Sequence, residues 1–178
     1  RFEIIGGSLY LKAGIALDYE SKPSYSVTVN VDDPSLGSGP ELSQGFTLNV
    51  GDVNEAPTSL YFYNTTATLA ENTSTGTRIA VASFSYSDDA QGSENYGVSG
   101  ADASYFEVIG NTLYLKAGAV LDYETKSTYS VNVTIDDPEL GGGPELSQVF
   151  TLSLSDVNEG PTNLSFYNVS NLINENTS

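Results

Sequence analysis

Two short acidic stretches carry the residues of this sequence that are best suited to chemistry. DVNEAP at residues 52–57 and DVNEGP at residues 156–161 each place an Asp, an Asn and a Glu within four positions. Clustered carboxylates repel one another unless a positive charge lies among them. The chain has no His and no Cys, so the ligands that it can offer a metal ion are oxygens. Ca²⁺ takes about six to eight oxygen ligands, and the two stretches therefore indicate a calcium site.

A second acidic pattern, LDYE, occurs at residues 17–20 and again at residues 121–124. Its Asp and Glu are two positions apart, so on a strand both side chains point to one face and toward one site. Glycosidases also use a pair of carboxylates, but catalytic sites seldom repeat in every module of a chain. Without His, a Ser nucleophile also lacks its usual general base. We therefore expect a binding site and no enzymatic activity.

The overall charge narrows the class of partner. Among 178 residues, 23 are acidic and 6 are basic, which gives a formal net charge of −17. Nucleic acid and anionic membranes are poor partners for such a chain. No apolar run approaches the ~20 residues of a membrane-spanning helix, so we expect no membrane insertion in this segment. Disorder is not expected either, because the hydrophobic residues fall in short, regularly spaced runs.

The chain repeats itself at an offset of 104 positions. Residues 1–74 align without a gap on residues 105–178, and about two-thirds of the aligned positions are identical. A period of this length means tandem domains rather than a solenoid of small units. Each acidic stretch ends in a proline that favours an extended linker, so we place boundaries before Pro57 and Pro161. Residues 1–56 are then the C-terminal part of one module, residues 57–160 a complete module, and residues 161–178 the first strand or strands of a third, as expected for a piece of a longer protein.

The hydrophobic period within the complete module is two almost everywhere. YSVNVTI (residues 129–135) and FTLSLS (residues 150–155) alternate apolar and polar side chains, and YFEVIGNTLYL (residues 105–115) reads as a hairpin that turns at Gly110–Asn111. RIAVASFSY (residues 78–86) changes phase between Val81 and Phe84, which predicts a β-bulge. About seven short strands without helical periodicity predict an all-β fold, with tandem antiparallel β-sandwich modules of the Ig-like, Greek-key type.

The motifs of the complete module follow one another in a specific order: LAENTSTGT, SDDAQGSEN, LDYE, VTIDDPELGGGPELS and SDVNEGP. In this order and at domain spacing they resemble cadherin repeats, in particular the cadherin-like modules of large bacterial surface and secreted proteins. The resemblance covers essentially the whole chain. It implies calcium bound where consecutive modules meet.

Carried over residue by residue, the resemblance implies two sets of ligands. At the first junction these are Asp18, Glu20, Asp52, Asn54 and Glu55 of the truncated module, with Asp88, Asp89, Asn95 and Asp136 of the next. At the second junction they are Glu71, Asp122, Glu124, Asp156, Asn158 and Glu159. The linker departs from the family pattern, with Glu in place of Asp and one residue fewer before Pro, and Asp88 is directly next to Asp89. We therefore expect fewer or weaker ions at each junction than in animal cadherins.

The function expected from these features is a structural or adhesive segment of an extracellular, multi-repeat surface protein of a bacterium, rigidified by Ca²⁺ at its linkers. Its partners would be neighbouring modules and, by homophilic or lateral self-association, other copies. One alternative is a carbohydrate-binding module of a secreted polysaccharide-active protein. It rests on tyrosines such as Tyr10 and Tyr114, which should face outward and could contact a surface glycan, although cross-strand packing explains them as well. The other is a filament subunit, in which residues 161–178 complete a module of a neighbouring chain.

Overall fold

The computed structural model describes residues 1–89, 91–169, 171–172 and 175, and nearly all of their regular structure is β-strand. The strands are β1 (Phe2–Ile5), β2 (Ser8–Leu11), β3 (Ser24–Val31), β4 (Leu42–Asn49), β5 (Thr58–Tyr63), β6 (Thr68–Ala70), β7 (Ile79–Ser87), β8 (Asn95–Ser99), β9 (Phe106–Ile109), β10 (Thr112–Leu115), β11 (Thr128–Asp136) and β12 (Leu146–Ser155). A single 3-10 turn, η1 (Ala103–Tyr105), precedes β9. Among the described residues, no helix is long and apolar enough to cross a membrane.

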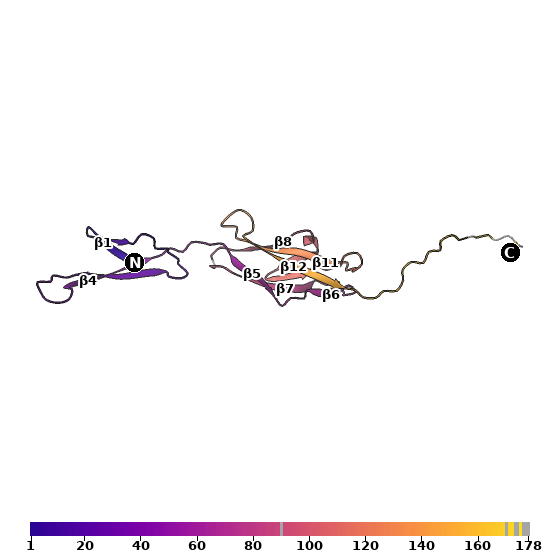
Figure 1. Ribbon diagram of the computed structural model, residues 1–178, viewed down its shortest axis with the longest axis horizontal. Coiled ribbons are helices and arrows are strands. Elements are labelled where there is room, and N and C mark those ends of the chain that lie inside the picture. The colour runs from indigo at the N-terminus through magenta and orange to yellow at the C-terminus, as the bar shows by residue number, and fades with distance from the viewer. Residues whose placement is uncertain (90, 170, 173–174, 176–178) are drawn as a thin grey trace.

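Residues 58–155 form a sandwich of two four-stranded sheets, seen in the centre of Figure 1. One sheet has the order β5-β7-β10-β9 and the other the order β6-β12-β11-β8. The alternating residues of β11 and β12 point inward, where Val133, Ile135 and Leu152 are completely buried. Phe62 of one sheet contacts Phe150 of the other edge to face, with ring centroids 5.5 Å apart. The predicted β-sandwich is confirmed.

The predicted bulge lies in β7. Its pairing with β10 shifts register between Leu113, which faces Ala82, and Tyr114, which faces Ala80. The extra residue between these positions is Val81, so Val81, Ala82 and Phe84 are all buried although they do not share one strand phase. A bulge of this kind adds one residue to one strand and turns later side chains to the other face.

One pair of strands is parallel, which the sequence did not predict. The chain leaves β5 at Asn64, whose φ of 50° bends the backbone, and crosses to the second sheet. During the crossing, Thr66 donates its N–H to Val81 of the first sheet, and Ala67 accepts one from Ser153 of the second. β6 then runs parallel to β12. This crossing ties the start of the module to the strand that leads into its C-terminal linker.

Residues 1–49 form two separate two-stranded sheets, β1-β2 and β3-β4, which repeat the strands β9 to β12. Phe46 and Phe150 hold equivalent places, yet Phe46 is 46% exposed and Phe150 only 5%. The difference arises because this stretch has no counterpart of β5 to supply the ring that Phe62 places against Phe150. The two-stranded sheets lie beyond the linker at one end of an elongated molecule (Figure 1).

Residues 161–169 repeat the sequence of β5 but form no strand. Leu164 and Phe166 are largely exposed, whereas the equivalent Leu60 and Phe62 pack against the core of the complete module. β5 pairs with β7, and in the repeat register the counterpart of β7 would lie beyond residue 178. Among the described residues, the apolar side chains of this stretch therefore have no sheet to join. The stretch extends away from the sandwich in Figure 1.

Candidate metal centre at the junction between modules

Four carboxylates meet at the first junction, and we call them the first acidic cluster: Glu20, Asp52, Glu55 and Asp89. One oxygen of each lies within 4.8 Å of one oxygen of every other. Glu20 lies in the turn before β3, Asp52 and Glu55 lie in the linker, and Asp89 follows β7 of the next module. The side chain of Asp89 also accepts the backbone N–H of Glu55 at 3.1 Å, and so joins the module to the linker. Residues from both sides of the linker thus contribute to one group of oxygens.

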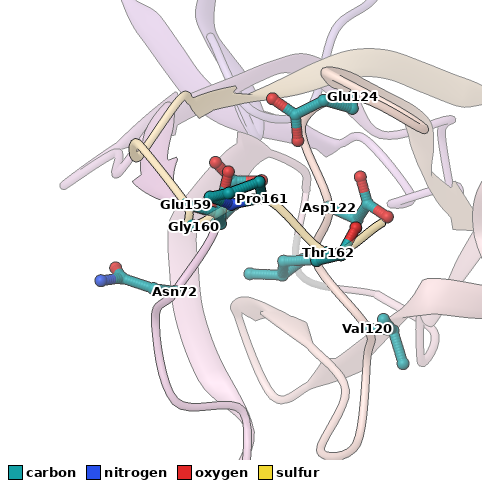
Figure 2. A pocket seen from close by; sticks show the side chains of 10 residues that line it. Asn72, Val120, Asp122, Glu124, Glu159, Gly160, Pro161 and Thr162 are labelled. Carbon is teal, nitrogen blue, oxygen red and sulfur yellow. The ribbon is translucent and has the colours of Figure 1, made fainter. Parts of the chain in front are cut away.

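The second acidic cluster lies at the other end of the complete module and consists of Glu71, Glu124, Asp156 and Glu159. Glu124, Asp156 and Glu159 are the repeat counterparts of Glu20, Asp52 and Glu55. An open pocket borders this cluster, and Figure 2 shows Glu124, Asp122 and Glu159 along its wall. The fourth carboxylate differs between the two clusters, because Asp89 comes from the following module and Glu71 from the same one.

Glu71 is the buried member of the second cluster, with 8% of its surface exposed. Its two carboxylate oxygens accept the backbone N–H of Tyr123 at 2.6 Å and that of Val157 at 2.7 Å. These two donors hold the pKa of Glu71 below its usual range. Glu71 therefore stays ionised and fastens the loop of LDYE to the start of the linker.

Two glutamates of the linkers, Glu159 and Glu55, have raised pKa values because of partial burial and the negative charges around them. Partial burial, and then the charges of Glu71 and Glu124, raise the pKa of Glu159. Partial burial, and then the charge of Glu20, raise the pKa of Glu55. A cation among these oxygens would relieve the repulsion, which makes the clusters chemically suited to a divalent ion.

The LDYE segment is a turn and not a strand, so the predicted same-face geometry of its Asp and Glu is wrong. Asp122 accepts the N–H of Thr125 at 2.8 Å and its hydroxyl at 2.8 Å, and Asp18 makes the same two contacts with Ser21. These bonds lower the pKa of both aspartates. Asp18 and Asp122 belong to neither acidic cluster, and the hydrogen bonds that they accept shape the turn that contains Glu20 and Glu124.

Asn54 and a buried carboxylate that the sequence analysis missed form a further contact across the first junction. The Nδ2 of Asn54 donates to Oδ2 of Asp137 at 2.7 Å, and Asp137 is completely buried. The Oδ1 of Asn54 is itself buried and has no hydrogen-bond partner among the described residues. An acceptor of this kind fits a metal ligand, because oxygen donors are what a hard cation requires. Asn158, the counterpart of Asn54, is exposed.

The remaining predicted ligands lie outside the two clusters. Asp136 faces Asn95 across the β8–β11 pair, and both line a separate pocket at the edge of that sheet. Asp88 belongs to neither cluster, so Asp89 is the member of the adjacent pair that reaches the first one. Strand alternation could have identified Asp137, because it continues the inward phase of Val131, Val133 and Ile135, whereas Asp136 does not.

The fold and the junction define a class of protein made of tandem β-sandwich modules with acidic linkers. Residues 65–155 match the cadherin domain. The chain is 30% identical over 165 residues to rat Cadherin-17, covering 87% of this chain and 19% of that protein. It is 28% identical over 150 residues to mouse Protocadherin Fat 4, covering 82% of this chain and 3% of that protein. The chain therefore belongs to the cadherin family.

Solved structures agree with this assignment at the level of the fold. The extracellular cadherin domains 3–6 of Protocadherin Gamma B2 superpose with a TM-score of 0.64 at 23% identity, covering 89% of this chain and 37% of that one. The named relatives are animal proteins, and the comparisons give no support to a bacterial origin. The chain spans a small part of the length of these relatives, so they define its domain type and not the activity of a whole protein.

Proposed function

We propose that this segment is part of an extracellular adhesive array whose modules are held in line by Ca²⁺ bound at each linker. At the first junction the ion would be held by Glu20, Asp52, Glu55 and Asp89, with Asn54 and Asp137 on the side of the following module. At the second it would be held by Glu71, Glu124, Asp156 and Glu159. Calcium would supply the positive charge that these oxygens lack. The modules of the array correspond to residues 1–56, 57–160 and 161–178.

The observation that carries this proposal is the composition of the first acidic cluster. Three of its carboxylates come from one module and its linker, and the fourth comes from the next module. Without a cation, the repulsion among them favours a bent or open linker. With a cation, the same oxygens would share one charge across the linker, and the two modules would move as one body.

Each acidic cluster contains only part of the ligand set that we propose for a complete junction. The first has the carboxylate of the following module but no counterpart of Glu71, and the second has Glu71 but no counterpart of Asp89. A junction between two complete modules would contain both. The first partners of this segment would therefore be the neighbouring modules of its own chain. We further propose that it self-associates with other copies at the cell surface.

The carbohydrate-binding alternative has no observation in its favour. The ring of Tyr114 lies under the guanidinium of Arg78, 5.4 Å from the centroid, as expected of a side chain packed within its own sheet surface. Tyr10 is 49% exposed and faces Glu3 across the β1-β2 pair. A glycan-binding site is therefore not proposed.

Thermal unfolding with increasing calcium tests the proposal. A ligand that binds only the folded state adds ~2.7 kcal/mol of stability at a hundredfold excess over its Kd. We expect the melting midpoint to rise with calcium and not with NaCl at matched ionic strength. Glu20→Gln and Glu124→Gln should each reduce the rise, whereas Glu3→Gln on the exposed surface of β1 should not. A midpoint that is insensitive to calcium would refute the proposal.

A further inference from the structure

The crossing from β5 to β6 begins with an Asn-x-Thr tripeptide, Asn64-Thr65-Thr66. In secreted proteins, Asn-x-Ser or Asn-x-Thr with any middle residue except proline is the pattern at which an oligosaccharide is attached to the asparagine. All three residues of this tripeptide are exposed. The side chain of Asn64 makes none of the hydrogen bonds or ion pairs found among the described residues. An attached sugar would therefore displace no polar contact of Asn64 in the folded module.

The backbone of the crossing is held by both sheets. Thr66 donates its N–H to Val81 at 2.7 Å, and Ala67 accepts the N–H of Ser153 at 2.9 Å. Asn64 has a φ of 50°, a left-handed conformation that asparagine adopts more readily than most residues. This conformation explains the asparagine by itself, but it makes no demand on the type of residue two positions later.

The second copy of this stretch separates the two explanations. Asn168 also has a left-handed φ, of 55°, and Val169 and Ser170 follow it in the sequence. Between the copies the middle residue changes from Thr to Val, whereas the asparagine and a hydroxyl residue two positions later are kept. The turn does not need that hydroxyl, because Thr66 makes its contact to the sheet through its N–H. A signal for attachment of an oligosaccharide does need it.

A second tripeptide of the same pattern, Asn72-Thr73-Ser74, lies in a different environment. Asn72 directly follows Glu71 and lines the pocket beside the second acidic cluster (Figure 2). An oligosaccharide on Asn72 would lie at the junction that we propose for the next module. Residues 64–67, by contrast, contribute no side chain to either acidic cluster. The attachment that is compatible with the proposed array is therefore the one at Asn64.

We propose that the side-chain amide of Asn64 carries an N-linked oligosaccharide. The donor would be an oligosaccharide on a polyprenyl diphosphate. Nδ2 of Asn64 forms a bond to the anomeric carbon of the first sugar, and the bond from that carbon to the diphosphate oxygen breaks. The amide gives up one proton, and polyprenyl diphosphate leaves. The hydroxyl of Thr66 is the group that the transferase would recognise. The proposal rests on the extracellular location proposed above, and it concerns a covalent modification, not the binding of a free glycan.

Peptide mapping of the secreted protein tests the assignment. The full 178-residue chain is secreted from cultured animal cells, treated with peptide-N-glycosidase F in water labelled with heavy oxygen, and analysed by mass spectrometry. The enzyme converts a glycosylated asparagine to a labelled aspartate, so label at residue 64 measures the occupancy of this site. A sample incubated without the enzyme measures spontaneous deamidation.

We expect label at residue 64 in most wild-type molecules. Thr66→Val should reduce the label to the level of the sample without enzyme, because the hydroxyl is lost while the N–H to Val81 stays. Thr65→Val and Thr66→Ser are the matched controls, since each introduces the residue that the second copy has at that position. Both should keep the label.

Two results would overturn the inference: a wild-type chain without label at residue 64, and label that persists in Thr66→Val. Melting the same secreted protein with increasing calcium keeps the two proposals apart. A midpoint that rises with calcium while residue 64 is unlabelled would leave the calcium-linked array standing and refute the attachment site. A labelled residue 64 with a midpoint insensitive to calcium would refute the array and support the attachment site.

Discussion

Glu71 and Glu159 lie in the same acidic cluster, yet their pKa values shift in opposite directions. Two backbone N–H groups favour the ionised form of Glu71. Partial burial and the neighbouring charges of Glu71 and Glu124 favour the protonated form of Glu159. A carboxyl with a lowered pKa stabilises the fold until the pH falls through that pKa, whereas one with a raised pKa destabilises the fold until it is protonated.

The pH dependence of stability should reveal this opposition. In calcium-free buffer, acidification from pH 7 toward the usual glutamate range, about 4 to 5, should first raise the melting midpoint as Glu159 is protonated. Further acidification should lower it as Glu71 loses its charge. Glu159→Gln should have a higher midpoint than wild type at pH 7 and a smaller first rise, because the raised pKa of Glu55 contributes to the rise as well. Thermal melts across this pH range measure both quantities. An unchanged profile in Glu159→Gln would contradict the assignment, and Glu3→Gln serves as the control.

The buried Asp137 should contribute to stability even without calcium. Asp137→Ala leaves the amide of Asn54 and the N–H of Glu139 without their acceptor, so we expect a loss of about 1–3 kcal/mol in urea unfolding. The counterpart Asp33 is exposed and has no linker asparagine against it, so Asp33→Ala should change stability little. Equal losses in the two variants would mean that the turn, and not the junction, depends on the carboxylate.

At the scale of single elements, β12 and its repeat counterpart β4 should contribute differently to the free energy of unfolding. The ring of Phe150 is buried against Phe62, so Phe150→Ala should cost about 3–5 kcal/mol. Phe46 is half exposed and contacts Phe2 edge to face at 6.3 Å, so Phe46→Ala should cost much less. Urea unfolding followed by tyrosine fluorescence compares the two. A large loss in Phe46→Ala alone would show that residues 1–49 hold the more cooperative core.

The sequence predicts strands well where side chains alternate between a core and solvent, and poorly where the backbone bonds to side chains. The alternation of β11 and β12, the hairpin of β9 and β10 and the bulge of β7 were all readable, because burial imposes a period of two. LDYE lacks such a constraint, and the two hydrogen bonds that Thr125 donates to the carboxylate of Asp122 hold the segment in a turn. The same period of two, continued one residue past the end of β11, points to Asp137, which the sequence analysis did not name.

For the whole molecule, the decisive property is how firmly each linker is held against the modules on either side. The two linkers of this chain have nearly the same sequence, so this property can be compared between them. Each contains DVNE before a proline, so a glutamate-specific protease can cut after Glu55 and after Glu159. Cleavage requires the linker to detach from its surroundings, and its rate therefore reports how firmly the linker is held. The N–H of Glu55 donates to Asp89 of the next module, whereas among the described residues Glu159 has no such partner from a following module.

We therefore expect calcium to protect the bond after Glu55 more than the bond after Glu159. Limited digestion in chelator and in calcium, with fragments identified by mass spectrometry, gives both rates in one sample, and cleavage after Glu3 serves as the internal standard for protease activity. Asp89→Asn should remove the difference between the linkers, because it weakens the contribution of the following module and leaves the linker sequence intact. Equal protection of the two linkers in wild type would mean that calcium acts within a module, and a rod held together at its junctions would be the wrong description.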